Sequence, residues 1–289
     1  MLKRKTMKTR TDFTGYKFRC SSLGKLMTGV KPNLTDKQSE LLETLIAKQR
    51  GGNITDKQII TLGQLIEKRD QRPTLSATTK NYLEQLHKEE VFGKREELRS
   101  KYLDKGIQVE EQSITLYSEL TDTLFIKNKD RKSNAFITGE PDNTQGKIRD
   151  IKSSWSLSTF PMHDDRLTNI DYWWQLQGYM ELFDLEDSEL IYCLVDTPEE
   201  LINDEMRRVG WKSGFTADIP DDLEAEIRSN MTFSDIPAAL RVKVFPVQRD
   251  RLAMRQLEEQ VIRCRAYMNN LSVKLGEYIQ NVDKELENA

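Results

Sequence analysis

The stretch FITGEPDNTQGKIRDIKSSW, residues 136–155, contains two short apolar runs joined by a polar turn, and both runs carry charged side chains. Asp142 closes the first run, and Asp150 and Lys152 lie two residues apart in the second. The segment NTQGK between them has the Asn and Gly that are typical of tight turns. The stretch therefore predicts a β-hairpin that brings two acids and a lysine together.

The spacing of these residues predicts where their side chains point. Residues two apart in a strand share a face, so Asp150 and Lys152 project together while Ile151 points into the core. Asp142, at the end of the neighbouring strand, is expected close to Asp150. Two adjacent carboxylates repel each other unless a cation lies between them, and hard oxygen ligands favour Mg²⁺ or Mn²⁺. The carbonyl of Ile151 is a further candidate ligand.

A metal at this position suits hydrolysis of a phosphodiester. The ion can lower the pKa of a bound water and stabilise the pentacovalent phosphate. Lys152 beside it could orient that water, help to deprotonate it or offset phosphate charge. The alternative, which the spacing alone leaves open, is an exposed hairpin whose charged side chains face solvent.

The rest of the chain supplies an α/β framework around this stretch. We expect strands within the segments 122–152, 188–198 and 240–248, and helices over 93–120, 168–184 and from Arg249 onward, with a further helical stretch after Pro198. Residues 93–120 read as one charged helix with a break near Gly106, and residues 210–237 as a polar insertion or loop region. This order predicts an α/β core with a mixed sheet.

Residues 34–92 contain a faint internal repeat. LTDKQSELLETLIAKQ is followed by ITDKQIITLGQLIEKR, and LSATTKNYLEQLHKEE is a looser third copy. Thr35 and Thr55 each precede a glutamine by three residues, Gln38 and Gln58, which is the spacing of a capping box at a helix start. The repeat predicts a small helical subdomain that serves as a scaffold or lid and not as a catalytic unit.

Composition narrows the functional classes. The chain has 289 residues and a formal net charge of -3, and no apolar run approaches the ~20 residues needed to span a bilayer. Three dispersed cysteines and two histidines disfavour a disulfide framework, an iron–sulfur cluster and a histidine-rich metal site, and they fit a reducing cytosol. Residues 1–31 are basic, with a single acid at Asp12. This arm either lies along phosphates or is a solvated tail.

The hairpin motif, GEPD followed by DIK, resembles the P-D…(D/E)-x-K signature of the restriction-endonuclease-like nucleases. Four other segments resemble a narrower branch, the phage recombination exonucleases of the YqaJ and lambda exonuclease type: RCSSLGKLM, the G-x-x-x-E spacing from Gly106 to Glu110, YWWQLQGY and VFPVQRDRLAMRQL. The resemblance covers roughly residues 18–28 and 100–265. It implies a restriction-endonuclease-like core, with a central mixed β-sheet flanked by helices, and an N-terminal helical insertion.

The resemblance also implies roles for individual residues. Four would hold the metal ions: Glu110, Asp142, Asp150 and, through its carbonyl, Ile151. Lys152 would serve the attacking water, and Gln175 would hold the water or a substrate phosphate. Two residues near a strand end would contact phosphate: Ser21 and Arg19. Two departures stand out. The second acid is Asp150 where Glu is commoner, and Glu140 replaces a usual Ser, which weakens the case for strict 5′-phosphate dependence.

Two local alternatives bear on the site. Glu111 competes with Glu110, but the two point about 100° apart on a helix, and the spacing from Gly106 favours Glu110. Four aromatic side chains of the 168–184 helix either stack on bases or pack in the core: Tyr172, Trp173, Trp174 and Tyr179. Gln177 is rotated about 200° from Gln175, so both glutamines cannot reach one ligand.

The whole pattern predicts three regions: a basic arm with the first core helix (1–30), a helical insertion (31–92) and a nuclease core with the C-terminal helix (93–289). The implied function is a Mg²⁺-dependent 5′–3′ exonuclease for double-stranded DNA ends, with Mn²⁺ able to substitute. By analogy we expect a single-strand annealing protein as partner, a homotrimer, no membrane association and the cytoplasm of a bacterial host. The alternatives are an endonuclease or flap nuclease, and a DNA- or protein-binding module with a degenerate site.

Overall fold

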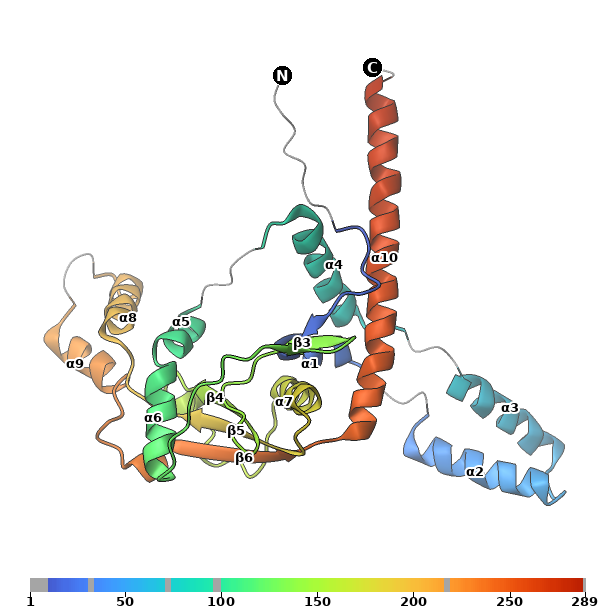
Figure 1. The fold of residues 1–289 in the computed structure, drawn as a ribbon, viewed down its shortest axis with the longest axis horizontal. Coiled ribbons are helices and arrows are strands. Elements are labelled where there is room, and N and C mark those ends of the chain that lie inside the picture. Colours follow the sequence, from blue (N-terminus) through green and yellow to red (C-terminus); the bar gives the residue numbers. More distant parts are fainter. Residues whose placement is uncertain (1–9, 31–33, 71–73, 96–99, 216–218, 288–289) are drawn as a thin grey trace.

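The computed structural model describes residues 10–30, 34–70, 74–95, 100–215 and 219–287, so the first nine residues of the basic arm lie outside the described part. It is a mixed α/β molecule in which helices surround two small sheets (Figure 1). The α/β class with mixed sheets flanked by helices, expected from the sequence, is confirmed.

Each sheet has three strands and combines parallel with antiparallel pairing. The first, in spatial order, contains β1 (Phe18–Arg19), β3 (Ile137–Gly139) and β2 (Lys132–Ser133). The second contains β4 (Ile148–Ser153), β5 (Asp187–Cys193) and β6 (Val242–Gln248). In both sheets one pair is parallel, β1 with β3 and β4 with β5, and the other is antiparallel, β2 with β3 and β5 with β6.

The expectation of a regular hairpin over residues 136–155 is wrong. β3 and β4 belong to different sheets, and one antiparallel bridge, Asn143 with Arg149, joins the segments between them. Pro141 has no N–H to extend a ladder after β3. The Asn143 side chain then bonds the backbone carbonyl of Ile126 at 2.9 Å, so the chain turns toward the preceding loop instead of continuing as a strand.

The helices fall into a central group and two peripheral pairs. The central group comprises α1 (Leu23–Met27), α4 (Ala77–Phe92), α5 (Lys101–Gln108), α6 (Glu110–Leu120), α7 (Ile170–Phe183) and α10 (Arg251–Glu287). The peripheral pairs are α2 (Asp36–Arg50) with α3 (Asp56–Asp70), and α8 (Glu199–Lys212) with α9 (Asp221–Ser229). The pairs lie at opposite ends of the molecule, and α10 extends well beyond the body (Figure 1).

The second sheet lies between two hydrophobic clusters. Ile148 and Leu190 face the main core, which includes residues of α1, α4, α7 and α10. Ile151 and Ile191 face a smaller core beneath α6. Because side chains alternate along a strand, this arrangement turns Asp150 of β4 toward α7.

Glycines let α7 approach the chain segment that contains α1. A Cβ on Gly178 would lie 2.6 Å from Leu23 Cδ1 and 2.9 Å from Cys20 Sγ. A Cβ on Gly24 would lie 2.6 Å from the Cα of Asp171, the second residue of α7. Such separations are shorter than packing allows, so the SSLGK segment and the α7 glycine are needed for this contact.

We expect Gly178→Ala to lower the free energy of unfolding by about 1–3 kcal/mol, because the added methyl group overpacks the contact between α7 and α1. The matched control is Gly276→Ala on α10, where a Cβ meets no atom within 4 Å. That change should raise the free energy of unfolding by up to about 1 kcal/mol. Urea denaturation measures both, and changes of the same sign in the two variants would contradict this account.

The repeat at 34–92 divides into two parts. α2 and α3 pack on each other through their own apolar cluster, which includes Leu45 and Leu65, and α2 begins with the expected Thr35–Gln38 capping box. α4, the third copy, instead contributes Leu83 and Leu86 to the main core. α4 packs in the core and not on α2 and α3 because its apolar face contacts α1 and α10.

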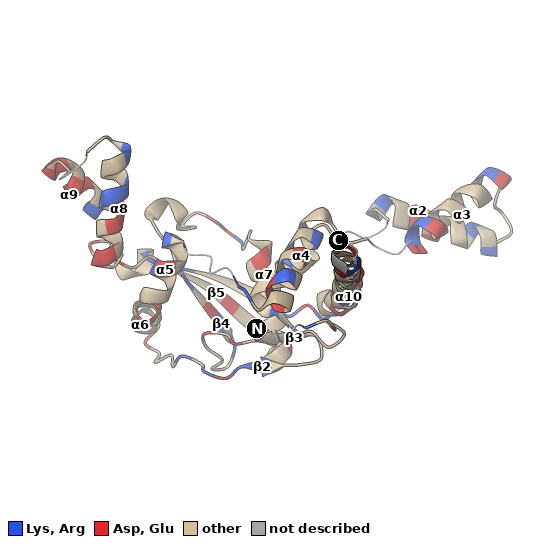
Figure 2. Cartoon of the chain, turned by 90° about the horizontal axis from the view of Figure 1, so that it is seen from above, with Lys and Arg blue, Asp and Glu red and all other residues tan. Residues whose placement is uncertain are grey.

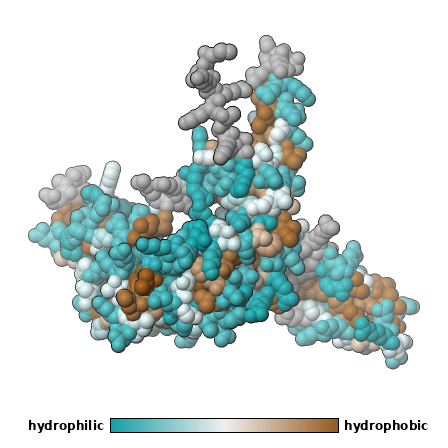
Figure 3. Space-filling view, in the orientation of Figure 1, coloured by the Kyte–Doolittle hydropathy of each residue, from teal (hydrophilic) through white to brown (hydrophobic). Residues whose placement is uncertain are grey.

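Apolar surface also remains exposed on the peripheral elements. The α2–α3 pair exposes Leu41 and Ile60, and the outer part of α10 exposes Val273 and Ile279. Figure 3 shows brown patches over both elements. In the described ranges, no helix combines the length and apolarity required to cross a membrane.

Helix boundaries differ in two places from the expectation. α4 ends at Phe92 with Gly93 as its C-cap, and the single helix expected over 93–120 is instead α5 and α6, which meet at Val109 and not at Gly106. The polar region 210–237 contains the helix α9, whose Ile227 packs against Met206 of α8. The segment 124–127 is not a strand, because its Ile126 backbone bonds side chains of the following turn instead of a neighbouring strand.

Candidate active site

The edge of β4 gathers four of the residues singled out in the sequence. Asp150 is 2% exposed, its Oδ1 accepts a hydrogen bond from Gln175 Nε2 at 3.1 Å, and its Oδ2 lies 2.7 Å from Lys152 Nζ. Asp142 Oδ2 accepts a hydrogen bond of 2.6 Å from the backbone N–H of Ile151. The structure therefore brings Asp142, Asp150, Lys152 and Gln175 together around one strand.

Proximity of the two carboxylates changes how Asp142 titrates. Burial and the charge of Asp150 raise the pKa of Asp142 to about 7, while Lys152 and the Ile151 N–H act in the opposite direction and Glu110 adds to the rise. With no ion bound, Asp142 therefore takes up a proton near neutral pH. The raised pKa indicates that the single charge of Lys152 does not compensate both carboxylates.

The same two carboxylates change the pKa of Lys152. Burial alone would lower its pKa, but the carboxylates of Asp150 and Asp142 outweigh burial and raise it. The Tyr172 ring, whose centroid is 5.2 Å from Lys152 Nζ, covers the ammonium. Lys152 is therefore a fixed positive charge in this state, which suits it to stabilise negative charge on a bound group.

The oxygen donors on this edge fit a hard divalent ion. Asp150 Oδ2 is buried and lies 2.7 Å from the Lys152 ammonium, which leaves the oxygen directed at the cation side of the strand edge. The N–H and C=O of one strand residue point to the same side, so the Ile151 carbonyl projects with its N–H toward Asp142 and away from β5. Two carboxylates and a carbonyl thus line one edge, a donor set that Mg²⁺ and Mn²⁺ prefer.

Glu110, the third acid, is held elsewhere. It is the first residue of α6, and its Oε2 lies 2.7 Å from Lys127 Nζ. Among the described residues, no three His, Cys, Asp or Glu side chains lie together as a metal-binding group. Glu110 lines the same cleft as Asp142 and Lys152, whereas Glu111 is exposed and does not line it.

A cleft of about 590 Å³ opens over these residues. It lies between α5, the start of α6 and the end of β4, and its lining includes Glu110, Asp142, Lys152 and Trp155. Figure 2 shows acidic positions on the central strands β4 and β5. The cleft leaves the carboxylate edge accessible to a bound group.

Lys105, which the sequence pattern did not reveal, fixes one wall of this cleft. It is fully buried on α5, and its Nζ donates to the backbone carbonyl of Trp155 at 3.2 Å. Burial lowers the pKa of Lys105 to about 8, against the opposing charge of Asp196. The Trp155 ring is also covered by Lys101 Nζ, 4.6 Å from its centroid. These contacts tie α5 to the segment that follows β4.

The two glutamines of α7 serve opposite faces of the helix. Gln175 Nε2 donates to the Tyr179 hydroxyl at 3.0 Å as well as to Asp150. Gln177 Nε2 donates to the Gln248 carbonyl at 2.8 Å, and its Oε1 accepts from the Asp250 N–H at 2.7 Å. Gln177 therefore anchors α7 to the junction of β6 with α10, and the two glutamines do not share a ligand, as their rotation on the helix predicts.

The aromatic residues of α7 mostly pack in the core. Trp174 and Tyr179 are buried in the main core, and Tyr172 and Trp173 are half-buried against it. Tyr172 also lines the cleft. Of the four, Tyr172 is thus the one that the structure places where a substrate could touch it.

Arg19 and Ser21 line a neighbouring hollow of about 660 Å³. Lys25 and Arg95 line it as well, and it shares Leu103 and Ile107 of α5 with the cleft over β4. Both Arg19 and Ser21 are exposed. The two hollows therefore adjoin at α5, and the first contains three cationic side chains together with Glu89 and Asp104, whereas the second contains the carboxylate site.

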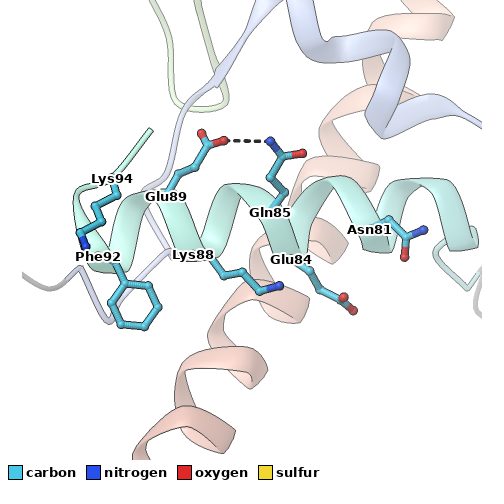
Figure 4. Close-up of a pocket in the computed structure, with 7 residues that line it drawn as sticks. All are labelled: Asn81, Glu84, Gln85, Lys88, Glu89, Phe92 and Lys94. Carbon is cyan, nitrogen blue, oxygen red and sulfur yellow. Dashed lines mark hydrogen bonds between the residues drawn. The ribbon is translucent and has the colours of Figure 1, made fainter. Parts of the chain in front are cut away.

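Two further features lie outside the carboxylate cleft. Glu140 Oε2 pairs with Arg131 at 3.0 Å, so its charge is compensated by an arginine. A separate hollow of about 550 Å³ runs along α4, where Gln85 and Glu89 are hydrogen-bonded to each other (Figure 4). Its lining includes none of the residues of the carboxylate site.

Comparison with known proteins gives structural neighbours only. No family model matches the chain, and no curated protein matches it in sequence.

The phage-related exonuclease from Haemophilus somnus 129PT superposes with a TM-score of 0.62 at 24% identity, covering 90% of this chain and 96% of that one. The alkaline exonuclease LHK-Exo from Laribacter hongkongensis superposes with a TM-score of 0.50 at 13% identity, covering 73% and 89%. Its complex with dAMP gives 0.52 at 13% identity, covering 93% and 96%. The chain thus has the fold of these phage-related and alkaline exonucleases.

Proposed function

We propose that the protein is a divalent-metal-dependent deoxyribonuclease that acts as a 5′–3′ exonuclease on double-stranded DNA ends. One observation carries the proposal: Asp142, Asp150 and the Ile151 carbonyl face one strand edge beside the Lys152 ammonium, within a fold shared with exonucleases. One neighbour, LHK-Exo, has been crystallised with dAMP, a deoxynucleoside monophosphate of the kind that exonucleolytic cleavage of DNA releases.

The oxygen donors support a metal site at the β4 edge in this proposal. Asp142, Asp150 and the Ile151 carbonyl would hold Mg²⁺ or Mn²⁺, and Glu110 would join them from α6. When bound, the ion supplies a water of lowered pKa and positive charge for the phosphate oxygens. Gln175 contributes by holding Asp150 Oδ1, which fixes the carboxylate so that Oδ2 remains directed toward Lys152.

Lys152 has the clearest chemical role of its own. Its ammonium stays protonated beside the two acids and can hold the attacking water or stabilise the negative charge that develops on phosphate. The hollow with Arg19 and Ser21 lies next to the cleft, so those side chains would contact the DNA backbone. In this proposal, phosphate contacts lie on one side of α5 and hydrolysis takes place on the other.

The biological setting is proposed by analogy alone. A resecting exonuclease of this type would work beside a single-strand annealing protein, as a homotrimer around duplex DNA, in the cytoplasm of a bacterial host.

Digestion of labelled DNA with Mg²⁺ tests the proposed activity. We expect linear duplex to lose mononucleotides from its 5′ ends and covalently closed circular duplex to remain intact. Comparison of 5′-phosphate with 5′-hydroxyl ends shows whether Glu140, paired with Arg131, relaxes the end requirement. Cleavage of the circle would favour an endonuclease, and cleavage of neither substrate would favour a binding module with a degenerate site.

A further inference from the structure

Lys127 occupies a position beside the metal-binding acids that no sequence motif indicated. It lies in the loop between α6 and β2, and its Nζ is 2.7 Å from Glu110 Oε2. The Glu110 side chain, which lines the cleft, is 26% exposed and the Lys127 side chain is 44% exposed, so the pair lies near the surface and not in the core. The contact is therefore open to exchange with a cation from solvent.

The loop that carries Lys127 is fixed to the segment that carries Asp142. The Asn128 N–H donates to the Asp142 carbonyl at 2.7 Å, and Asn128 Nδ2 donates to the Pro141 carbonyl at 3.0 Å. On the other side of Lys127, the Ile126 carbonyl accepts from Asn143 Nδ2 at 2.9 Å. Both sequence neighbours of Lys127 are thus hydrogen-bonded to residues 141–143, which fixes the loop that carries the ammonium beside the segment of Asp142.

We propose that Lys127 is the built-in counter-cation of Glu110, and that a divalent metal ion must displace its ammonium before Glu110 can join Asp142 and Asp150 as a ligand. This inference rests on the proposed function, because it assigns the exchange to the same metal site. With the ammonium 2.7 Å from Oε2, the charge of Glu110 is already compensated, and a divalent ion that approaches the same carboxylate is repelled by the ammonium. Metal binding therefore breaks the 2.7 Å ion pair and costs the free energy of that contact.

A consequence is that Lys127 lowers the affinity of the site for metal. An exposed ion pair contributes up to about 1 kcal/mol, which corresponds to a roughly threefold to fivefold change in a dissociation constant. Once displaced, the ammonium remains tethered beside the cleft by the Asn128 and Asn143 contacts.

The test is a titration of the metal-free full-length protein with Mn²⁺ in the absence of DNA. Electron paramagnetic resonance of the free ion measures how much Mn²⁺ is bound. We expect Lys127→Met to bind Mn²⁺ about threefold to fivefold more tightly than wild type. The matched control is Lys129→Met, which removes the same charge from the same loop. The Lys129 side chain makes no ion pair in the described part of the chain. The Mn²⁺ dissociation constant of Lys129→Met should therefore stay within about twofold of the wild-type value.

A double-mutant comparison and a charge-preserving variant sharpen the test. In a Glu110→Gln background, Lys127→Met should no longer change Mn²⁺ affinity, because the ion pair is already absent. Lys127→Gln, which also removes the charge, serves if Lys127→Met fails to fold, and Lys127→Arg, which preserves the positive charge, should keep wild-type affinity. Tightening of equal size in Lys127→Met and Lys129→Met would reduce the effect to net charge and overturn the inference.

Two other outcomes separate the inference from the proposed function. If wild type and Lys127→Met bind Mn²⁺ equally well, the role of Lys127 is refuted while the metal-dependent nuclease stands. If wild type binds no Mn²⁺ at millimolar concentration, both are refuted.

Discussion

Replacing Lys152 with methionine is expected to reduce the rate of DNA cleavage by at least about 10³-fold, since the change removes the positive charge beside the reacting phosphate. Methionine retains most of the volume of the side chain, so the fold should persist. The rate of mononucleotide release from end-labelled duplex, at saturating Mg²⁺, measures the effect.

Controls distinguish loss of charge from loss of structure. Lys152→Arg preserves the positive charge at the position 2.7 Å from Asp150 Oδ2 and should retain more activity than Lys152→Met. Thermal unfolding of both variants checks that they are folded. A Lys152→Met protein that cleaves DNA within tenfold of the wild-type rate would remove Lys152 from the mechanism.

The second large effect concerns Asp142, for which we expect Asp142→Asn to abolish cleavage and yet stabilise the metal-free protein at alkaline pH. The folded-state pKa of Asp142 is raised to about 7 by burial and by Asp150, well above the value of about 3.9 for an unfolded chain. The folded protein thus binds more protons than the unfolded chain between these values, and wild-type stability falls as pH rises through this window. Asparagine, which carries no charge, removes that penalty.

The expected gain at pH 8 is on the order of 4 kcal/mol in the free energy of unfolding, from about three pKa units at about 1.4 kcal/mol each, with little gain at pH 4. Urea denaturation in EDTA at both pH values measures it. Asp130→Asn, an exposed position in the loop after α6, is the control and should follow the wild-type pH profile. A difference between Asp142→Asn and wild type that does not depend on pH would contradict the electrostatic account of the site.

Strand periodicity was sufficient to place the central residues of the site. Asp150 and Lys152 share a face of β4, as their two-residue spacing predicts, and Ile151 packs in the opposite core. The prediction of a hairpin over residues 136–155 is wrong because local turn signals do not reveal which strands pair. β4 pairs with β5, about forty residues later in the chain, and that choice depends on long-range packing.

Other features had no signal in a single sequence. Lys127 and Lys105 reach the site through loop and helix positions fixed by distant hydrogen bonds to Glu110 and Trp155, and neither belongs to a spacing motif. α4 resembles the repeat of α2 and α3 in sequence but packs into the main core, because tertiary contacts with α1 and α10 decide its place. Helix boundaries are also hard to predict from one sequence, since α5 and α6 meet at Val109 and not at the expected Gly106.

The central claim, that Asp142 and Asp150 hold a divalent ion at the edge of β4, is tested most directly by a crystal soaked in Mn²⁺ and measured at the manganese absorption edge. The account predicts an anomalous peak within coordination distance of both carboxylates and the Ile151 carbonyl, with the Glu110–Lys127 contact broken. A well-ordered site with no peak between the two carboxylates, under conditions in which the protein cleaves DNA, would contradict it.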